Sequence, residues 1–237
     1  MSPLPTFGFV TLHRQPLADG VGAEAAWLAR CADGGPAAAH LWTAPAGLVV
    51  PRRCAALPGW AAVDKTGVQV RASGGGLVPQ GPGVWNLTLV WPAADAAVGA
   101  AAHGMHAVYP ALCGEMAAAF VRLGVQARPG QVPGAFCDGR WNLAIGGRKF
   151  VGTAQAWKRF GPRTVVMAHA VIVIDADPAA LTARCNAFEQ ALGSGVRYRA
   201  DALTCLAHEL PDPRDAEART LTVLAERFGT LLLNEET

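Results

Sequence analysis

Residues 141–157, WNLAIGGRKFVGTAQAW, decide the fold class of this sequence. The two halves of the stretch, 141–145 and 148–157, are separated only by Gly146-Gly147. Glycine accepts a positive φ at both central positions of a two-residue turn, and a tight hairpin demands this. The stretch therefore predicts two antiparallel strands joined by a two-residue turn.

Further strand and helix patterns lie on both sides of this hairpin. The segments 85–90 and 166–175 are rich in β-branched residues, which favour strands. Around them, apolar residues recur at helical spacing. The sequence predicts helices at 20–31, 108–123, 178–192 and from Asp212-Pro213 to near residue 233. For the helix at 178–192, Asp177 is a typical N-cap and Gly193 a typical C-cap.

Strands interspersed with helices, several of them joined as hairpins, are typical of an α+β fold. We expect a mainly antiparallel, mixed β-sheet flanked by helices. A length of 237 residues suits one or two domains, and no linker or internal repeat divides the chain. The expectation is therefore a single domain over residues 1–237.

Charge and hydrophobicity exclude several classes of protein. With 20 basic and 18 acidic residues, the net charge is only +2, too small for a nucleic-acid binder held mainly by bulk charge. A hydrophobic content of 51% excludes a disordered chain. No stretch approaches the ~18 uninterrupted apolar residues that span a bilayer, and the start MSPLPTFGFV lacks the features of a signal peptide. We expect a soluble, cytoplasmic protein that binds neither nucleic acid nor membranes.

The cysteine pattern argues against a metal site. Six cysteines are spread along the chain without a CxxC pair. A zinc site requires clustered thiolates or histidines, and a disulfide framework requires a small secreted chain. We therefore expect no metal and mostly buried, reduced thiols that pack as small hydrophobic side chains.

A glycine-rich stretch, Arg71-Ala72-Ser73-Gly74-Gly75-Gly76, follows the strand-like segment 67–70. Three consecutive glycines lose much backbone entropy on folding, so they are useful where the backbone must approach a ligand closely. Their N–H groups can then donate to carbonyl or phosphate oxygen, and Arg71 adds a charge-assisted donor. The alternative is a plain flexible loop. Neither a Walker loop nor the GxGxxG dinucleotide pattern is present.

The second strand of the hairpin carries Lys149 among small residues. Strict alternation would put Lys149, Val151, Thr153 and Gln155 on one face of the strand. Gly152 weakens a strand interior unless something must approach closely. An ammonium there can bind a phosphate or acyl carbonyl and stabilise charge that develops in acyl transfer. The alternative is a surface hairpin with a solvated lysine.

Together and in this order, the two stretches resemble the lipoate–protein ligase and octanoyltransferase family, which is related to biotin–protein ligase. That family carries R-x-S/T-G-G-G/R after a strand, matched here by Arg71, Ser73, Gly74, Gly75 and Gly76. Its hairpin pattern N/E-L-x-x-x-G-R-K-x-x-G-S/T-A-Q is matched by Asn142, Leu143, Gly147, Arg148, Lys149, Gly152, Thr153, Ala154 and Gln155. A strand that begins with a histidine follows, here His169.

The resemblance implies an activity and its partners. A lipoyl or octanoyl group would be attached to a lysine on a lipoyl domain of a 2-oxoacid dehydrogenase or a glycine-cleavage protein. Lipoate or octanoate would be the substrate, with ATP and Mg²⁺ if the enzyme is a ligase. An acyl carrier protein is a further candidate partner if the enzyme is a transferase.

The resemblance also implies site roles. Arg71 and the loop of Ser73, Gly74, Gly75 and Gly76 would hold the acyl carbonyl or the adenylate phosphate. Lys149 would bind the same electrophilic centre, and Gly152, Thr153 and Ala154 would form the wall of the pocket. His169, at the head of an apolar strand, is interpreted as a structural histidine. The sequence does not select which of the tryptophans line an acyl tunnel.

Cys137 bears on the reaction type. Some octanoyltransferases of this family use a cysteine nucleophile shortly before the lysine hairpin, and Cys137 lies near that place. A thiolate there would accept an acyl group as a thioester and pass it to the acceptor lysine. We also expect no C-terminal accessory domain of the kind that many ATP-using ligases carry. Ligase and thioester transferase both remain open.

One segment departs from the family pattern. Members commonly carry an aromatic residue and a histidine after the glycines, where this sequence has Pro79-Gln80-Gly81-Pro82. A non-catalytic binding module that kept the pocket is therefore an alternative. A biotin–protein ligase is a third candidate, although no match to the arginine-rich glycine loop of that family is found.

Overall fold

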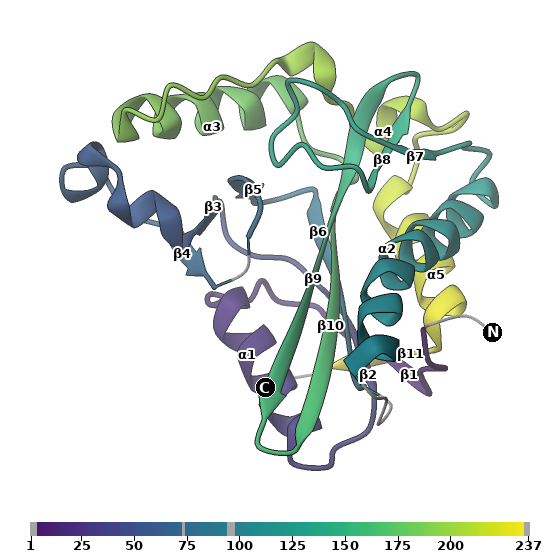
Figure 1. The fold of residues 1–237 in the computed structure, drawn as a ribbon. Helices are drawn as coiled ribbons and strands as arrows, with labels where there is room; N and C mark the ends of the chain where they lie inside the picture. Colours follow the sequence, from purple (N-terminus) through teal and green to yellow (C-terminus); the bar gives the residue numbers. More distant parts are fainter. Residues whose placement is uncertain (1–3, 73, 94–97, 235–237) are drawn as a thin grey trace.

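The computed structural model describes residues 4–72, 74–93 and 98–234. Within them, a large mixed sheet of eight strands forms the centre of the fold (Figure 1). In spatial order the strands are β11 (Thr230–Asn234), β1 (Phe9–His13), β2 (Ala38–Trp42), β6 (Val84–Pro92), β10 (Arg163–Val173), β9 (Arg148–Phe160), β8 (Asn142–Ile145) and β7 (Arg128–Gly130). Strand β1 pairs parallel with both of its neighbours, and every pairing from β2 to β7 is antiparallel. The expected α+β class with a mainly antiparallel sheet is confirmed.

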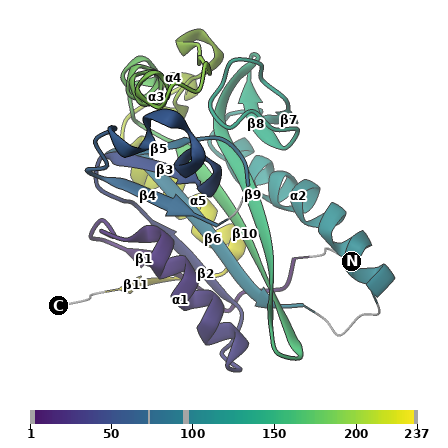
Figure 2. The same ribbon diagram turned by 60° about the vertical axis from the view of Figure 1, so that its left-hand side comes forward.

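A second, smaller sheet and the helices cover the two faces of the large one. The smaller sheet has the order β4 (Val68–Arg71), β3 (Gly47–Pro51), β5 (Val78–Gln80). The α-helices are α1 (Gly20–Ala32), α2 (Val98–Val121), α3 (Pro178–Leu192), α4 (Leu206–Glu209) and α5 (Ala216–Phe228). Short 3₁₀ helices are η1 (Arg52–Ala56), η2 (Pro58–Ala61) and η3 (Ala200–Ala202). Helices α2 and α5 lie on one face of the large sheet, and α1 and the smaller sheet lie on the other (Figures 1 and 2).

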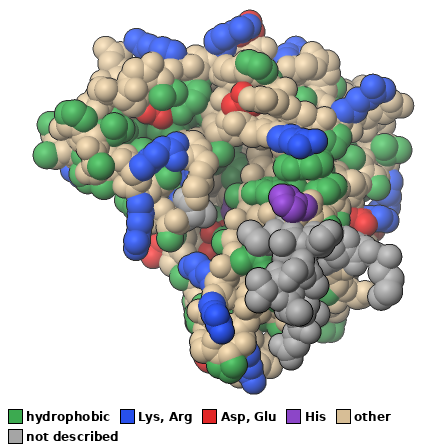
Figure 3. Space-filling view, in the orientation of Figure 1, with side chains coloured by type: hydrophobic (Ala, Val, Ile, Leu, Met, Phe, Trp, Pro, Cys, Tyr) green, Lys and Arg blue, Asp and Glu red, His purple; other side chains and the backbone are tan. Residues whose placement is uncertain are grey.

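One face of the molecule is mixed in charge, and no described helix is a membrane span. On the face that Figure 3 shows, lysine and arginine side chains are scattered and interspersed with acidic ones. Among the described residues, no helix combines the length and the apolar character that crossing a membrane requires.

The hairpin at 141–157 forms as predicted. Gly146 and Gly147 have φ values of 57° and 78°, so both central residues of the turn take the left-handed conformation. On the side of α2, Phe150 of β9 meets Phe120 edge-on, with 5.1 Å between ring centroids. This contact helps to fix β9 against the core on the α2 side.

A β-bulge changes which side chains of β9 share a face. Leu143 pairs with Val151, but the next residue of β8, Ala144, pairs with Lys149, so β9 has one extra residue there. As a result Lys149 Nζ lies 3.0 Å from the point that a Cβ on Gly152 would occupy. The alternation expected from the sequence, with Lys149 opposite to Gly152, is therefore wrong, because the bulge shifts the phase by one residue.

The helix boundaries are partly as predicted. Helix α3 starts with the Asp177 carboxylate accepting from the Ala179 N–H at 2.8 Å and ends at Gly193 with φ 68°. By contrast, the helix expected from Asp212-Pro213 to near 233 is only α5. The Asp212 carboxylate caps a turn by accepting from the Arg214 N–H at 3.1 Å. After α5 the chain becomes β11, whose backbone pairs with β1 instead of extending the helix.

Two helical glycines provide a test of how tightly α1 packs against Trp42 of β2. A Cβ on Gly20 would lie 2.2 Å from the Trp42 ring, whereas a Cβ on Gly114 would meet nothing within 4 Å. We expect Gly20→Ala to lower the free energy of unfolding by about 1–3 kcal/mol through overpacking. Gly114→Ala should raise it by roughly 0.5–1 kcal/mol through helix propensity. Urea unfolding of both variants measures the two effects, and equal shifts would contradict the packing described here.

Candidate functional site

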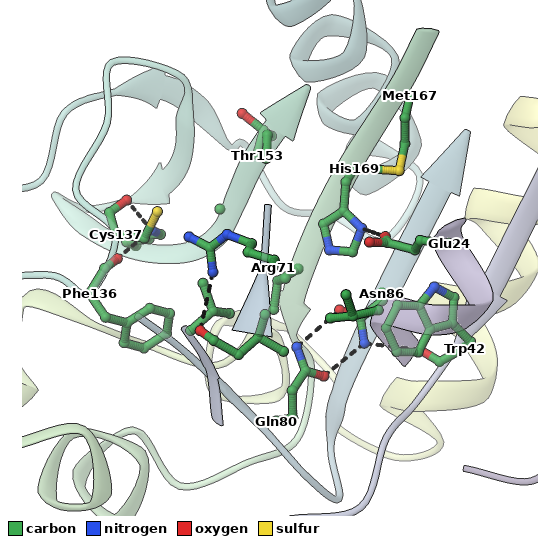
Figure 4. A pocket seen from close by; sticks show the side chains of 17 residues that line it. Glu24, Trp42, Arg71, Gln80, Asn86, Phe136, Cys137, Thr153, Met167 and His169 are labelled. Carbon is green, nitrogen blue, oxygen red and sulfur yellow. Dashed lines mark hydrogen bonds and ion pairs between the residues drawn. The ribbon is translucent and has the colours of Figure 1, made fainter. Parts of the chain in front are cut away.

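A pocket opens between α1, the smaller sheet and the strands β6, β9 and β10 of the large sheet (Figure 4). Its volume is about 630 Å³, counting the space that opens to solvent. Its apolar lining is contributed by Val21, Val49, Val78, Phe136, Met167 and Val171. The lining also includes Arg71, Cys137, Lys149, Gly152, Thr153 and Ala154. Two stretches that are far apart in the sequence are thus brought together around one apolar cavity.

Lys149 is a buried ammonium held by backbone carbonyls. The side chain is 1% exposed, and Nζ donates to the carbonyl oxygens of Phe136 at 2.7 Å and Cys137 at 3.0 Å. Nζ also lies 5.1 Å from the centre of the Phe136 ring. Burial lowers the pKa of Lys149 to about 8, while Cys137 and Asp138 oppose the change. The alternative of a solvated surface lysine is therefore wrong.

Cys137 differs from the other cysteines of the chain. Five of the six are buried, as expected, whereas Cys137 is half-buried and lines the pocket. Its φ of 47° is positive, which is uncommon for a residue other than glycine and is frequent at functional sites. Its Sγ accepts a hydrogen bond from the Gly76 N–H at 3.1 Å. The neighbouring Asp138 carboxylate accepts instead from the Val132 N–H, at 2.9 Å.

The glycine loop packs directly onto Cys137. A Cβ on Gly76 would lie 2.9 Å from Cys137 Cα, and one on Gly75, whose φ is 97°, would lie 2.9 Å from Cys137 Sγ. The Arg71 guanidinium donates to the carbonyl oxygens of Gly74 and Gly76. Ser73 lies outside the described residues. These glycines therefore allow the loop to approach Cys137 closely. Arg71 holds the described part of the loop through its hydrogen bonds to Gly74 and Gly76.

The small residues of β9 leave room for Lys149. Because Gly152 has no side chain, the Lys149 ammonium occupies the space above it. The Thr153 hydroxyl donates to the Trp141 carbonyl oxygen at 2.5 Å and so ties β9 to the start of β8. Asn142 donates to the Gly139 carbonyl oxygen at 2.7 Å and holds the end of the loop that contains Cys137.

A contact between a carboxylate and a histidine in the pocket was not predicted from the sequence. His169 Nδ1 lies 2.5 Å from a Glu24 carboxylate oxygen, which also accepts from the Thr88 hydroxyl at 2.9 Å. Trp42 donates its indole N–H to the same hydroxyl at 3.0 Å. Burial raises the pKa of Glu24, but the contacts with His169 and Thr88 outweigh it and leave that pKa below its ordinary value. The one available sequence signal was a single carboxylate among the small and apolar residues of α1.

The segment that departs from the family pattern is ordered and contributes to the pocket. Its first residues belong to β5, and the buried Gln80 side chain exchanges two hydrogen bonds with the buried Asn86, at 3.2 and 2.9 Å. Asn86 also donates to the Trp42 carbonyl oxygen at 3.4 Å. Gln80 and Asn86 therefore form a hydrogen-bonded, polar part of the pocket lining.

Arg71, which precedes the glycine loop, and the buried hairpin lysine belong to the two motifs that carry the family resemblance, and both line this pocket. The family model for the lipoyl protein ligase A/B catalytic domain matches residues 24–226. The chain belongs to this family, and the resemblance that the two sequence motifs indicated is confirmed.

Individual relatives agree with this assignment. An uncharacterized protein of Cupriavidus necator is 44% identical over 190 residues, 73% of this chain and 74% of that protein. An octanoyl-[GcvH]:protein N-octanoyltransferase of Kyrpidia tusciae is 37% identical over 219 residues, 84% of this chain and 73% of that protein. The structure of protein Ta0514 from T. acidophilum with bound lipoic acid superposes with a TM-score of 0.64, covering 97% of this chain and 90% of that one. At 16% identity, the last likeness concerns the fold alone.

The lowered pKa of Lys149 predicts how stability depends on pH. The folded protein releases this proton near pH 8, and the ordinary pKa of lysine is 10.5. Between these values the unfolded chain binds more protons, so folding stability rises with pH across this window. Relative to Lys149→Met, the wild-type protein should gain about 1–2 kcal/mol of unfolding free energy between pH 7.5 and pH 9.5. Urea unfolding of both proteins measures the difference, and parallel pH profiles would contradict the buried ammonium.

Proposed function

We propose that this enzyme transfers an octanoyl or lipoyl group to a lysine of a lipoyl domain through a thioester on Cys137. The observation that carries the proposal is the position of Cys137 Sγ in an apolar pocket, 3.1 Å from the Gly76 N–H. A thiolate is a strong nucleophile toward an acyl carbonyl. The ammonium of Lys149 and the backbone N–H of Gly76 supply positive partners for charge that develops there.

The name of the Kyrpidia tusciae relative supports a particular acyl donor. That protein is an octanoyl-[GcvH]:protein N-octanoyltransferase. If this chain catalyses the same reaction, the donor is an octanoyl-lysine amide on GcvH, and the acceptor is a lysine nitrogen on another protein. An acyl carrier protein thioester and free lipoate activated by ATP and Mg²⁺ are the competing donors.

In the first half-reaction the Cys137 sulfur attacks the carbonyl carbon of the acyl donor. The carbon–nitrogen bond of the donor amide breaks, the thiol proton leaves with the amine, and a thioester forms on Cys137. Negative charge develops on the carbonyl oxygen in between, and stabilisation of such an oxyanion is usually the largest catalytic term. In the second half-reaction the acceptor lysine attacks the thioester, and the thiol is restored.

Lys149 is suited to stabilise the oxyanion that forms in this reaction. An ammonium has three N–H donors, and two of those on Lys149 are used by the carbonyl oxygens of Phe136 and Cys137. Among the described residues the third has no hydrogen-bond partner, and Nζ lies above Gly152, which lines the pocket. At neutral pH, below its pKa of about 8, Lys149 keeps its charge.

The apolar walls are suited to a medium-length acyl chain. Burial of each methylene contributes about 0.8 kcal/mol, so an eight-carbon chain gains several kcal/mol of binding. Trp42 and Met167 line the pocket with Val21 and Val171. Binding energy from this chain is available to hold the reacting carbonyl beside Cys137.

The first test compares wild-type protein with Cys137→Ser and an apo lipoyl domain as acceptor. Three donors are supplied separately: octanoyl-GcvH, octanoyl-acyl carrier protein, and lipoate with ATP and Mg²⁺. We expect acylation from a protein-bound donor, with a trapped acyl-enzyme in the wild type and none in Cys137→Ser. Mass spectrometry of the intact enzyme and of the acceptor detects both products.

Each other outcome has a defined meaning. Full activity of Cys137→Ser with strict dependence on ATP would replace the transferase by a ligase whose cysteine is structural. If no donor changes the mass of any of several apo lipoyl domains, the enzyme assignment gives way to the binding-module alternative.

The second test concerns Lys149. Replacement by alanine should cost about 2.7–4 kcal/mol of transition-state stabilisation, the scale for removal of one oxyanion donor. Lys158→Ala is the matched control, because Lys158 lies on the same strand β9 but does not line the pocket. Steady-state kinetics with octanoyl-GcvH measures both. Turnover of Lys149→Ala close to that of the control would remove Lys149 from the mechanism.

A further inference from the structure

The Arg71 side chain is engaged with the backbone of the protein itself. Its Nε and one terminal nitrogen donate to the Gly74 carbonyl oxygen at 3.2 and 3.0 Å. The same terminal nitrogen donates to the Gly76 carbonyl oxygen, and the other donates to the Val49 carbonyl oxygen of β3 at 3.1 Å. The guanidinium therefore links the glycine loop to the smaller sheet.

These contacts fix one particular peptide group. The carbonyls of Gly74 and Gly76 belong to the peptide groups on either side of the one that joins Gly75 to Gly76. The N–H of that central group donates to Cys137 Sγ. Glycine populates both signs of φ about equally, so a free three-glycine segment would point this N–H in many directions. Because both flanking carbonyls are held, the central N–H keeps its direction toward the sulfur.

The space around the loop is consistent with a fixed orientation. The position for a Cβ on Gly75 is 2.9 Å from Cys137 Sγ and 3.0 Å from a terminal nitrogen of Arg71. The backbone at Gly75 is thus in close contact with both the guanidinium and the sulfur. Figure 4 shows the Arg71 guanidinium on the same side of the pocket as Cys137.

We propose that Arg71 is a positioning residue that acts through the glycine loop. By holding the loop, it keeps the Gly76 N–H pointed at the reacting centre. The N–H first donates to the Cys137 sulfur and then to the oxyanion that forms beside it. This inference rests on the proposed function and replaces direct binding of the acyl carbonyl by Arg71. Preorganised backbone N–H donors of this kind stabilise developing charge at little cost in reorganisation.

The experiment separates Cys137 reactivity from acyl-chain binding. In Arg71→Lys and Arg71→Ala we expect slower alkylation of Cys137 by iodoacetamide at pH 7. Formation of the acyl-enzyme from octanoyl-GcvH should slow by roughly 10²-fold, the scale for one lost oxyanion donor. The dissociation constant for octanamide should stay unchanged, because Arg71 does not hold the acyl chain. Added guanidinium ion should restore part of the alkylation rate of Arg71→Ala.

Two further variants control the test. Arg53→Ala removes an exposed charge that acts on Arg71 electrostatically, and it should leave alkylation unchanged. Gly75→Ala crowds the same loop, so its effect on alkylation should not add to that of Arg71→Ala. Melting curves establish that each variant is folded.

The outcomes distinguish this inference from the proposed function. Normal alkylation together with weakened octanamide binding in the Arg71 variants would overturn the inference and assign Arg71 to the substrate. Failure of wild-type protein to form an acyl-enzyme would overturn the proposed function. The alkylation result would still decide whether Arg71 controls the loop, since alkylation does not depend on turnover.

Discussion

The buried ammonium of Lys149 is the constraint on which the site depends. A charge removed from water costs much free energy unless polar groups replace the solvent. Here the carbonyl oxygens of Phe136 and Cys137 do so. Both carbonyls must turn toward β9, and this orientation fixes the loop in which Cys137 has its positive φ. The solvation of one cation thereby determines where the candidate nucleophile lies.

The bulge in β9 makes that solvation possible. With one extra residue in the strand, Lys149 and Gly152 share the pocket face while Phe150 packs against α2. A regular strand would direct Lys149 and Gly152 to opposite faces. β-bulges frequently redirect a side chain next to an active site. The glycine loop then closes the arrangement from the smaller sheet, since only residues without Cβ atoms fit against Cys137.

Much of this was accessible from the sequence, and the remainder has identifiable causes. The hairpin, α3 with its Asp177 and Gly193 caps, and the pairing of the two motifs followed from local patterns and from the family resemblance. The face of β9 on which Lys149 lies could not be predicted, because the order of polar and apolar residues in the sequence does not reveal the bulge. The end of α5 was misjudged because leucines in β11 continue the helical spacing while their backbone pairs with β1. The contact between Glu24 and His169 was not predicted, because the two residues are far apart in the sequence and only the packing of α1 against β10 brings them together.

The pairing of β11 with β1 has a consequence for how the molecule assembles. Strand β1 lies between β2 and β11, so its two neighbours come from opposite ends of the described chain. Contacts between residues distant in sequence form late, because loop-closure entropy must be overcome first. On the ribosome, β1 is synthesised early but stays open at one edge until β11 emerges. Strands β8, β9 and β10, which include Lys149, are joined by short-range hairpins and can pair with one another before that edge is covered.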